Sequence, residues 1–250
     1  MNIVRLNMSH ADHASSTKVI NWIKTLNRKV KYPVAILLDT QGPEIRTGEI
    51  NEPMDLAAGD EVSISVLPED VERSSILIDY HELIDVLHVG SKLTVDNGLI
   101  NFEVLEKEGP RMRCKVLDGG SLGSRRHVNL PGVRVNLPAI TAKDRNDIAF
   151  GVSHDVDFIA LSFVRSAADI EELRGVLGSK AKNIKIIAKI EDQQGVTNVR
   201  EIVGAADGVM VARGDLGIET NIADLPNVQR RIVHSCARGG KRSIVATQIG

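Results

Sequence analysis

The stretch from Ile184 to Gly217 contains two pairs of charged residues, each placed after a short apolar run. Lys189 and Glu191 end the first run, Arg213 and Asp215 follow the second, and a segment of helical composition lies between them. This pattern predicts a strand, a helix and a parallel strand. Side chains alternate along a strand, so we expect the members of each pair to point the same way.

These charges permit two interpretations. If the strands are neighbours, Glu191 and Asp215 converge at one edge, and two carboxylates suit Mg²⁺. Lys189 beside that ion would suit a negative charge that develops on a transferring group. Alternatively, the two acids begin the following helices, whose N-termini recruit acids, and the lysine is a solvated strand end. Spacing alone leaves both interpretations open.

The composition is that of an ordinary globular protein. The 250 residues are 42% hydrophobic and 26% charged, with a formal net charge of −2. This balance favours neither nucleic acid nor membrane as a partner, and no apolar run reaches the roughly 18 residues of a membrane span. Met1 precedes a strand-like segment, so we expect no signal peptide. The distant Cys114 and Cys236 are expected to be reduced thiols in a cytoplasmic protein.

Strand and helix units repeat at both ends of the chain, which predicts a parallel sheet with helices outside it. The expected strands are 2–7, 33–38, 156–163, 184–190, 208–211 and 243–246, and the expected helices are 12–29, 166–177, 196–203 and 225–238. Each strand ends in polar residues. Because a parallel barrel has its active site at the carboxyl ends of its strands, this arrangement favours a barrel over an open sheet.

The middle of the chain follows a different pattern. Short alternating strands replace helical periodicity, and they are expected at 61–67, 92–95, 99–105 and 111–117. Asn97-Gly98 between two of them is a strong hairpin signal. We interpret 44–141 as an inserted domain, which leaves 1–43 and 142–250 as the two parts of the barrel. Six strands then remain, whereas a (β/α)8 barrel has eight in about 250 residues. The predicted fold is therefore α/β, an incomplete TIM (β/α)8-type barrel with an inserted small all-β lid domain.

Seven segments carry a family resemblance. In chain order they read IVRLNMSH, LLDTQGPEIRTG, GSRRHVNLPG, LSFVR, KIE, ARGDLG and ATQ. Each looks like a motif of the pyruvate kinase family, and their order is the order of that family. The resemblance implies glycolytic transfer of a phosphoryl group from phosphoenolpyruvate to ADP, which yields pyruvate and ATP. It also implies a TIM barrel whose inserted β domain acts as a lid.

The resemblance implies two cation sites. Asn7, Ser9, Asp39 and Thr40 would bind K⁺, and all four residues carry the oxygen atoms that a hard cation requires. Glu44 resembles the potassium-dependent members, where independent members carry lysine, so we predict dependence on K⁺. The second site would hold Mg²⁺ or Mn²⁺, and sequence leaves the choice between these open. Its ligands would be Glu191 and Asp215.

The remaining implied roles concern the substrate and the nucleotide. Phosphoenolpyruvate would be bound by Arg5, Ser162, Phe163, Lys189, Gly214, Asp215 and Thr247. ADP or ATP would be bound by His10, Arg46 and Arg126. The catalytic residues would be Arg46, Lys189 and Thr247. By this resemblance, Lys189 would stabilise the transferring phosphoryl group, and Thr247 would lie near the enolate carbon that receives a proton.

The chain also departs from the family pattern. Asp96-Asn97 replaces the usual Asp-Asp of the lid, and Gln41 stands where many members have lysine. The first and last barrel strands and the carboxyl-terminal domain of the family are missing, so we expect a fragment. Two hypotheses stay open: a phosphotransferase whose full-length form is a homo-oligomer, and a catalytically incompetent fragment without a stable closed barrel. Another phosphoenolpyruvate or pyruvate barrel enzyme would not explain the K⁺ residues or the lid.

Overall fold

The computed structural model describes residues 1–68, 75–133, 135–220 and 222–246. The chain divides into two compact units. The first contains Met1–Pro43, Leu137–Gly217 and Ala223–Gly250, and the second contains Glu44–Asn136 and Ile218–Ile222. The all-β unit is therefore inserted into the α/β unit. Within the described residues, no helix is both long and apolar enough to cross a membrane.

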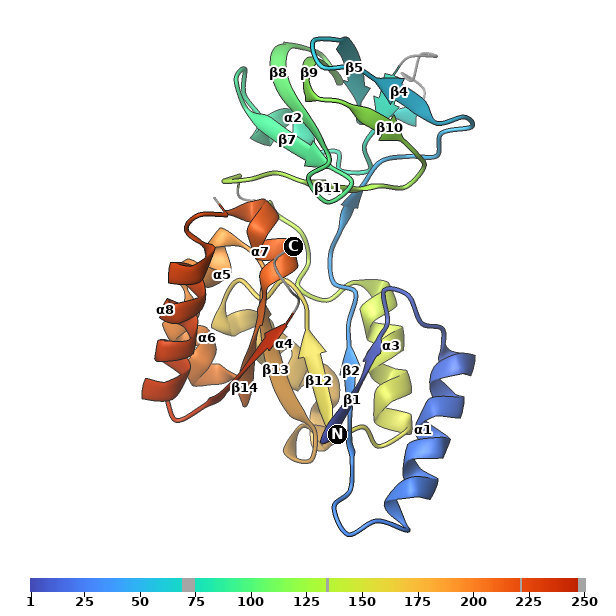
Figure 1. The fold of residues 1–250 in the computed structure, drawn as a ribbon, viewed down its shortest axis with the longest axis vertical. Helices are drawn as coiled ribbons and strands as arrows, with labels where there is room; N and C mark the ends of the chain where they lie inside the picture. Colours follow the sequence, from blue (N-terminus) through green and yellow to red (C-terminus); the bar gives the residue numbers. More distant parts are fainter. Residues whose placement is uncertain (69–74, 134, 221, 247–250) are drawn as a thin grey trace. The chain divides into compact units, whose positions relative to one another are not determined.

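The first unit is built on a parallel sheet of six strands (Figure 1). In spatial order the strands are β1 (Ile3–Asn7), β2 (Ala35–Asp39), β12 (Phe158–Leu161), β13 (Lys185–Ile190), β14 (Gly208–Ala212) and β15 (Arg242–Ala246). Spatial order equals chain order, so the sheet never reverses direction as a doubly wound sheet does. This is the winding of a TIM-type barrel, and the described strands leave it open between β1 and β15. The predicted incomplete barrel is confirmed.

Helices follow the strands of this sheet and pack beside it (Figure 1). They are α1 (His13–Asn27), α3 (Ala142–Ser153), α4 (Ala167–Leu177), a 3-10 turn (Gly178–Lys182), α5 (Gln193–Thr197), α6 (Val199–Ala205), α7 (Arg213–Glu219) and α8 (Leu225–Arg238). The expected helix over 196–203 is wrong in its bounds. Two short helices meet at Asn198, whose Nδ2 donates to the Arg165 carbonyl at 2.8 Å.

Sequence reading missed α3 altogether. The helix carries two buried acids, Asp144 and Asp147, in place of the apolar stripe that marks most core-facing helices. Its start has a clear signal, however, because Thr141 and Asp144 form a capping box. A search for capping pairs, rather than for apolar periodicity, would have located the helix.

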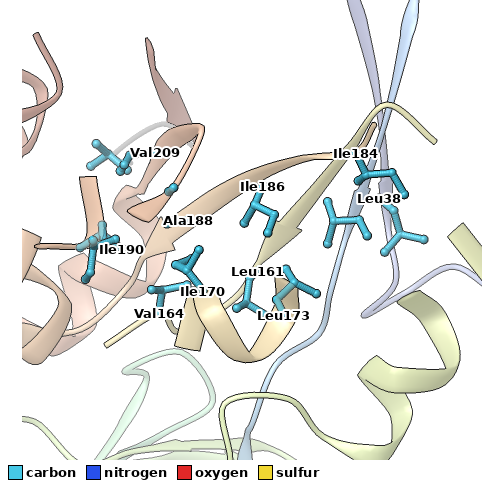
Figure 2. Close-up of a cluster of buried hydrophobic side chains, with 14 of the residues drawn as sticks. Leu38, Leu161, Val164, Ile170, Leu173, Ile184, Ile186, Ala188, Ile190 and Val209 are labelled. Carbon is cyan, nitrogen blue, oxygen red and sulfur yellow. The ribbon is translucent and has the colours of Figure 1, made fainter. Parts of the chain in front are cut away.

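The sheet of the first unit has two unlike faces. Alternate residues such as Leu38, Leu161 and Ile186 point to the helices and belong to the large apolar core. Figure 2 shows part of this core, where side chains of β12, β13 and α4 gather. The opposite face has a much smaller apolar cluster that includes Leu37 and Ile187. Beyond that cluster, toward the carboxyl ends, the same face carries polar side chains.

In the second unit, the described residues of Glu44–Asn136 form mainly strands, with one short α-helix, α2 (Leu83–Val86). Its larger sheet has the order β3 (Ile45–Arg46), β11 (His127–Asn129), β7 (Lys92–Val95), β8 (Ile100–Glu108), β9 (Arg111–Asp118), β5 (Glu61–Ser65) and β6 (Ser75–Leu77). A smaller sheet pairs β10 (Gly120–Leu122) with β4 (Met54–Leu56). The predicted strands at 61–67, 92–95, 99–105 and 111–117 correspond to β5, β7, β8 and β9. The predicted domain bounds at 44 and 141 stay predictions.

The predicted hairpin joins β7 to β8, where Val95 pairs with Ile100. The backbone φ angles of Asp96, Asn97 and Gly98 are +55°, +58° and +85°. Three consecutive residues therefore occupy the left-handed region, which asparagine and glycine tolerate better than other residues. Asn97, the departure from the family pattern, suits the conformation of this turn.

Candidate active site

The pleat of the barrel strands places the site residues on the inner face of the sheet. Arg5 pairs in register with Leu37, a member of the inner apolar cluster, and Asn7 pairs with Asp39. Lys189 lies two residues beyond Ile187, another member of that cluster. Because side chains alternate, residues two apart share a face. Arg5, Asp39 and Lys189 therefore face the interior of the incomplete barrel.

Lys189 lies at the centre of this group. Its Nζ donates to Ser162 Oγ at 2.7 Å and lies 3.1 Å from both Glu191 Oε1 and Asp39 Oδ1. The lysine is 7% exposed, and both acids are buried. Arg5 Nε approaches the other carboxylate oxygen of Asp39 at 2.5 Å. Two basic and two acidic groups thus form one network at the strand ends, and Lys189 and Glu191 point the same way as predicted.

The network keeps Lys189 charged. Burial acts to lower the pKa of this lysine, but the negative charges of Glu191 and Asp39 outweigh burial and raise it. The pKa of Glu191 is also raised, to about 7: burial is the largest cause, Lys189 opposes the rise, and the charge of Asp215 adds to it. The carboxylate form of Glu191 therefore needs more positive charge than the network supplies.

The two residues that follow β12, Ser162 and Phe163, form hydrogen bonds with Lys189 and Glu191. The Phe163 amide donates to Glu191 Oε2 at 2.7 Å, and the φ angle of Phe163 is +51°. Ser162 donates its hydroxyl to the Thr40 carbonyl at 2.7 Å and its amide to Thr40 Oγ1 at 3.1 Å. A positive φ in a bulky residue is strained and is concentrated at functional sites. Ser162 and Phe163 thus belong to the same network as Lys189.

Asp215 does not lie on a strand, which corrects one expectation. β14 ends at Ala212, and Arg213, Gly214 and Asp215 form the first turn of α7. Arg213 and Asp215 are therefore two residues apart on a helix, where they do not share a face. The strands that precede the two acids are nevertheless neighbours, with Ile190 paired to Val211. The charge of Asp215 acts on the pKa of Glu191, so the two acids are close enough to interact.

The expected potassium ligands lie at the adjacent ends of β1 and β2: Asn7 and Asp39 end the two strands, and Ser9 and Thr40 follow them. The Met8 amide donates to the Asp39 carbonyl at 2.9 Å, which ties the two ends together. Asn7 Oδ1 accepts from the Ser9 amide at 3.1 Å. His10 follows in the same turn, where its amide donates to the Asn7 carbonyl at 3.2 Å.

Both expected cation sites fit the donor atoms present. The described residues contain no cluster of three or more His, Cys, Asp and Glu suited to a metal ion. Mg²⁺ usually needs only one or two protein carboxylates, however. A divalent cation bound to Glu191 would supply the positive charge that favours the carboxylate form of this buried acid. At the other site, Asp39 Oδ1 is buried, and the charged group beside it is Lys189 Nζ at 3.1 Å. The side-chain oxygens of Asn7, Ser9, Asp39 and Thr40 are the kind of ligand that a hard monovalent cation requires.

The second unit places two expected nucleotide ligands beside each other. Arg46 of β3 pairs with His127 of β11, and Arg46 Nη1 donates to the Arg125 carbonyl at 2.8 Å. Arg126 is the next residue, and its Nη1 lies 3.4 Å from Asp96 Oδ1 at the hairpin turn. Arg46 also forms an ion pair with Glu44. Thr247, the last expected site residue, lies outside the described residues.

Sequence reasoning missed the support that α3 gives to the rim. Asp144 Oδ1 accepts from the Gly42 amide at 3.0 Å, just after Asp39 and Thr40. Gly42 has a φ of +80°, and a Cβ there would lie 2.7 Å from Ser162 Cβ. The positive φ and the close approach to Ser162 both require glycine at position 42. The capping box at Thr141 was the available signal for this helix.

The six parallel strands in chain order, with the charged network of Lys189, Glu191 and Asp39 at their carboxyl ends, define a TIM-barrel protein whose candidate site lies at that rim. The model of the family "Pyruvate kinase, barrel domain" matches residues 1–249. The chain therefore belongs to the pyruvate kinase family.

Curated relatives agree with this family. The chain is 44% identical to a pyruvate kinase of Clostridium perfringens over 252 residues, covering all of this chain and 53% of the relative. It is 46% identical to a pyruvate kinase of Geobacillus stearothermophilus and 42% identical to plastidial pyruvate kinase 2 of Arabidopsis thaliana, and it covers 43% of each. The chain thus spans about half the length of these relatives, or somewhat less.

Proposed function

We propose that the protein is a phosphotransferase that converts phosphoenolpyruvate and ADP into pyruvate and ATP in glycolysis. The phosphoryl group leaves the enol oxygen of phosphoenolpyruvate and bonds to a terminal oxygen of ADP, and the enolate carbon takes up a proton. The observation that carries this proposal is the charged network around Lys189, which is buried between Glu191 and Asp39. Family membership supports it.

The barrel rim would bind the substrate through charge. Phosphoryl transfer depends mostly on positioning and on stabilisation of negative charge. Lys189 is already held beside Ser162, so little reorganisation accompanies its contact with the transferring group. Arg5 would hold the substrate phosphate from the neighbouring strand. The Gly214 backbone would admit the substrate carboxylate, Ser162 and Phe163 would contact the substrate from the end of β12, and Thr247 would lie near the enolate carbon.

Glu191 and Asp215 would hold Mg²⁺ or Mn²⁺, and Asn7, Ser9, Asp39 and Thr40 would hold K⁺. When bound, these cations supply positive charge that offsets the phosphate and carboxylate charges of the substrate. The protein's part is to keep the oxygen atoms at the rim while Lys189 stays protonated. The raised pKa of Lys189 supports that state at neutral pH.

Nucleotide binding would involve the second unit. Arg46 lies on β3, and Arg126 immediately precedes β11, the strand that pairs with β3. Guanidinium groups suit phosphate through parallel hydrogen bonds. His10 of the barrel would contribute as well. In this proposal the inserted unit is the lid, as expected from the sequence. The same proposal predicts that the protein acts in the cytoplasm and that its full-length form is a homo-oligomer.

A second candidate is a catalytically incompetent fragment that keeps the site residues without turnover. The coverage of only 43% to 53% of the relatives keeps this alternative in view. Such a fragment would keep the contacts described for Lys189, Glu191 and Asp39. It would not close the barrel around the substrate, so water would not be excluded from the site.

A coupled assay of pyruvate formation separates the two candidates. The protein receives phosphoenolpyruvate, ADP and Mg²⁺, with either KCl or an equal concentration of choline chloride. Turnover that needs both Mg²⁺ and K⁺ is the expected result. Absence of turnover, together with no thermal stabilisation by phosphoenolpyruvate and Mg²⁺, would instead establish the incompetent fragment.

A further inference from the structure

The segment from Met8 to His13, here called the rim loop, joins β1 to α1 and carries Ser9 and His10. Several of its backbone bonds are local. The amides of Ser9, His10 and Ala11 all donate to oxygen atoms of Asn7, at 2.9–3.2 Å. These bonds fix the curvature of the loop. All three bonds have their acceptors on Asn7, the residue before the loop. These bonds therefore do not fix the position of the rim loop relative to the helices.

Helix α3 supplies anchors for both ends of the rim loop. At the first residue, Lys143 Nζ donates to the Met8 carbonyl at 2.7 Å. At the last residue, His13 Nε2 forms a hydrogen bond with Asp147 Oδ1 at 2.7 Å. Lys143 and Asp147 are one turn apart on α3, and Lys143 Nζ also donates to Asp147 Oδ2 at 2.7 Å. One carboxylate therefore connects the two ends of the loop.

The surroundings of Asp147 make this connection stiff. Its side chain is 5% exposed, whereas its partners Lys143 and His13 are 48% and 47% exposed, so the carboxylate is the buried end of both contacts. Phe150, on the next turn of α3, stacks on the His13 ring with centroids 4.3 Å apart and an angle of 9° between the planes. This stacking fixes the orientation of the ring that contacts Asp147. The buried carboxylate and the stacked ring therefore hold the His13 end of the rim loop against α3.

We propose that Asp147 and Lys143 are positioning residues for the monovalent-cation site. They act through the Met8 backbone, which lies between Asn7 and Ser9, two of the ligands assigned to K⁺ in the proposed function. The Met8 amide, in the peptide bond to Asn7, donates to the backbone carbonyl of Asp39, a third ligand, and the Met8 carbonyl, in the peptide bond to Ser9, accepts from Lys143. The two bonds therefore hold the peptide units on either side of Met8, and Lys143 sets the orientation of the one that leads to Ser9. A cation needs several oxygens at fixed spacing. Release of the carbonyl would loosen that spacing.

The test compares Lys143→Met and Asp147→Asn with the wild-type protein, and it uses Lys182→Met as the control. Lys182 is an exposed lysine of the 3-10 turn after α4. Asp147→Asn keeps the side-chain shape and an acceptor oxygen for His13, so it is the milder change. Far-ultraviolet circular dichroism and cooperative unfolding establish that each variant is folded.

The first readout is hydrogen exchange of the rim loop, which does not depend on the cation or on activity. Both variants should speed exchange of the amides in 9–13 by about tenfold, the equilibrium equivalent of one hydrogen bond to a charged group. The control should not change it. Wild-type exchange in both variants would overturn the positioning role, whatever the cation does.

The second readout is the KCl concentration that gives half of the thermal stabilisation, with choline chloride keeping ionic strength constant. Both variants should raise this concentration about tenfold, as loss of outer residues around metal sites does. A merely structural role would lower the unfolding temperature without moving the midpoint. If wild type is stabilised specifically by K⁺ and the variants keep its midpoint, the inference fails alone. If K⁺ acts no better than choline on wild type, the proposed cation site fails and the inference with it.

Discussion

Lys189 of the barrel unit and the two arginines assigned to the nucleotide in the inserted unit differ in how they are held. At the barrel rim, Lys189 is buried and has two acids and a hydroxyl within 3.1 Å. In the inserted unit, the side chains of Arg46 and Arg126 are 33% and 45% exposed and have partners within their own unit. The rim group is therefore fixed before any ligand arrives. The inserted arginines keep part of their surface free for one.

This difference predicts a division of labour. A buried, fixed charge stabilises a transition state efficiently, because no reorganisation is needed when charge develops. Exposed arginines contribute less, since water screens them and their side chains lose freedom on binding. We therefore expect substitutions at the rim to abolish turnover and to weaken the fold. Substitutions in the insert should act on nucleotide affinity alone.

Lys189→Met should have the largest effect. It leaves Glu191 and Asp39 buried without their shared cation, which should lower the free energy of unfolding by about 3–5 kcal/mol. Turnover should fall by about 100-fold to 1,000-fold, the usual cost of losing one preorganised hydrogen-bond donor. Urea unfolding and the pyruvate assay measure the two effects. Lys185→Met is the matched control, because Lys185 begins the same strand, is 56% exposed and pairs only at 3.4 Å with Asp207.

A double variant tests the origin of the stability effect of Lys189. Adding Glu191→Gln removes one of the charges left buried without Lys189, so Lys189→Met/Glu191→Gln should regain part of the free energy of unfolding that Lys189→Met loses. Urea unfolding of both variants measures the difference. A double variant no more stable than Lys189→Met would mean that the buried charge of Glu191 is not the cause of the loss.

Arg126→Met should have an intermediate effect that is confined to the nucleotide. Loss of a charged hydrogen bond to phosphate should raise KM for ADP about tenfold to 100-fold. Because the arginine is exposed, the free energy of unfolding should change by less than about 1 kcal/mol. Arg113→Met is the control, since Arg113 lies on β9 of the same unit and pairs with Glu61 and Glu106. Steady-state kinetics with both substrates varied would contradict the division of labour if KM for phosphoenolpyruvate rose instead.

Asn97→Ala should have the smallest effect and should act on stability only. Its φ of +58° disfavours alanine, so the free energy of unfolding should fall by about 1 kcal/mol. Asn97→Gly should differ from wild type by less than about 0.5 kcal/mol, since glycine accepts this conformation. Urea unfolding of the pair tests the assignment. Equal stabilities for alanine and glycine would show that the turn does not hold this conformation in solution.

The barrel strands and the rim pair Lys189 and Glu191 were predictable because they depend on local pattern. An apolar β-branched run predicts a buried strand, and alternation then fixes which residues share a face. The same rule failed for Asp215, because the strand ends at Ala212 and a helix begins there. Where a strand stops depends on packing that the local sequence does not encode.

Other features depended on contacts between distant segments. Lys143 and Met8 are 135 residues apart, and nothing in either segment indicates the hydrogen bond between them. The pairing of Arg46 with His127 likewise follows from the register of β3 and β11, two very short strands. The family resemblance assigned roles to Arg46 and Arg126. It did not indicate which groups hold them in place.

The most direct test of the account is the position of a divalent ion. Crystals of the protein grown or soaked with Mn²⁺ and phosphoenolpyruvate should give an anomalous peak at the barrel rim. The account predicts one ion bonded to both Glu191 and Asp215 at about 2.1 Å. Carboxyl groups too far apart to share an ion, or an ion held elsewhere at full occupancy, would contradict it.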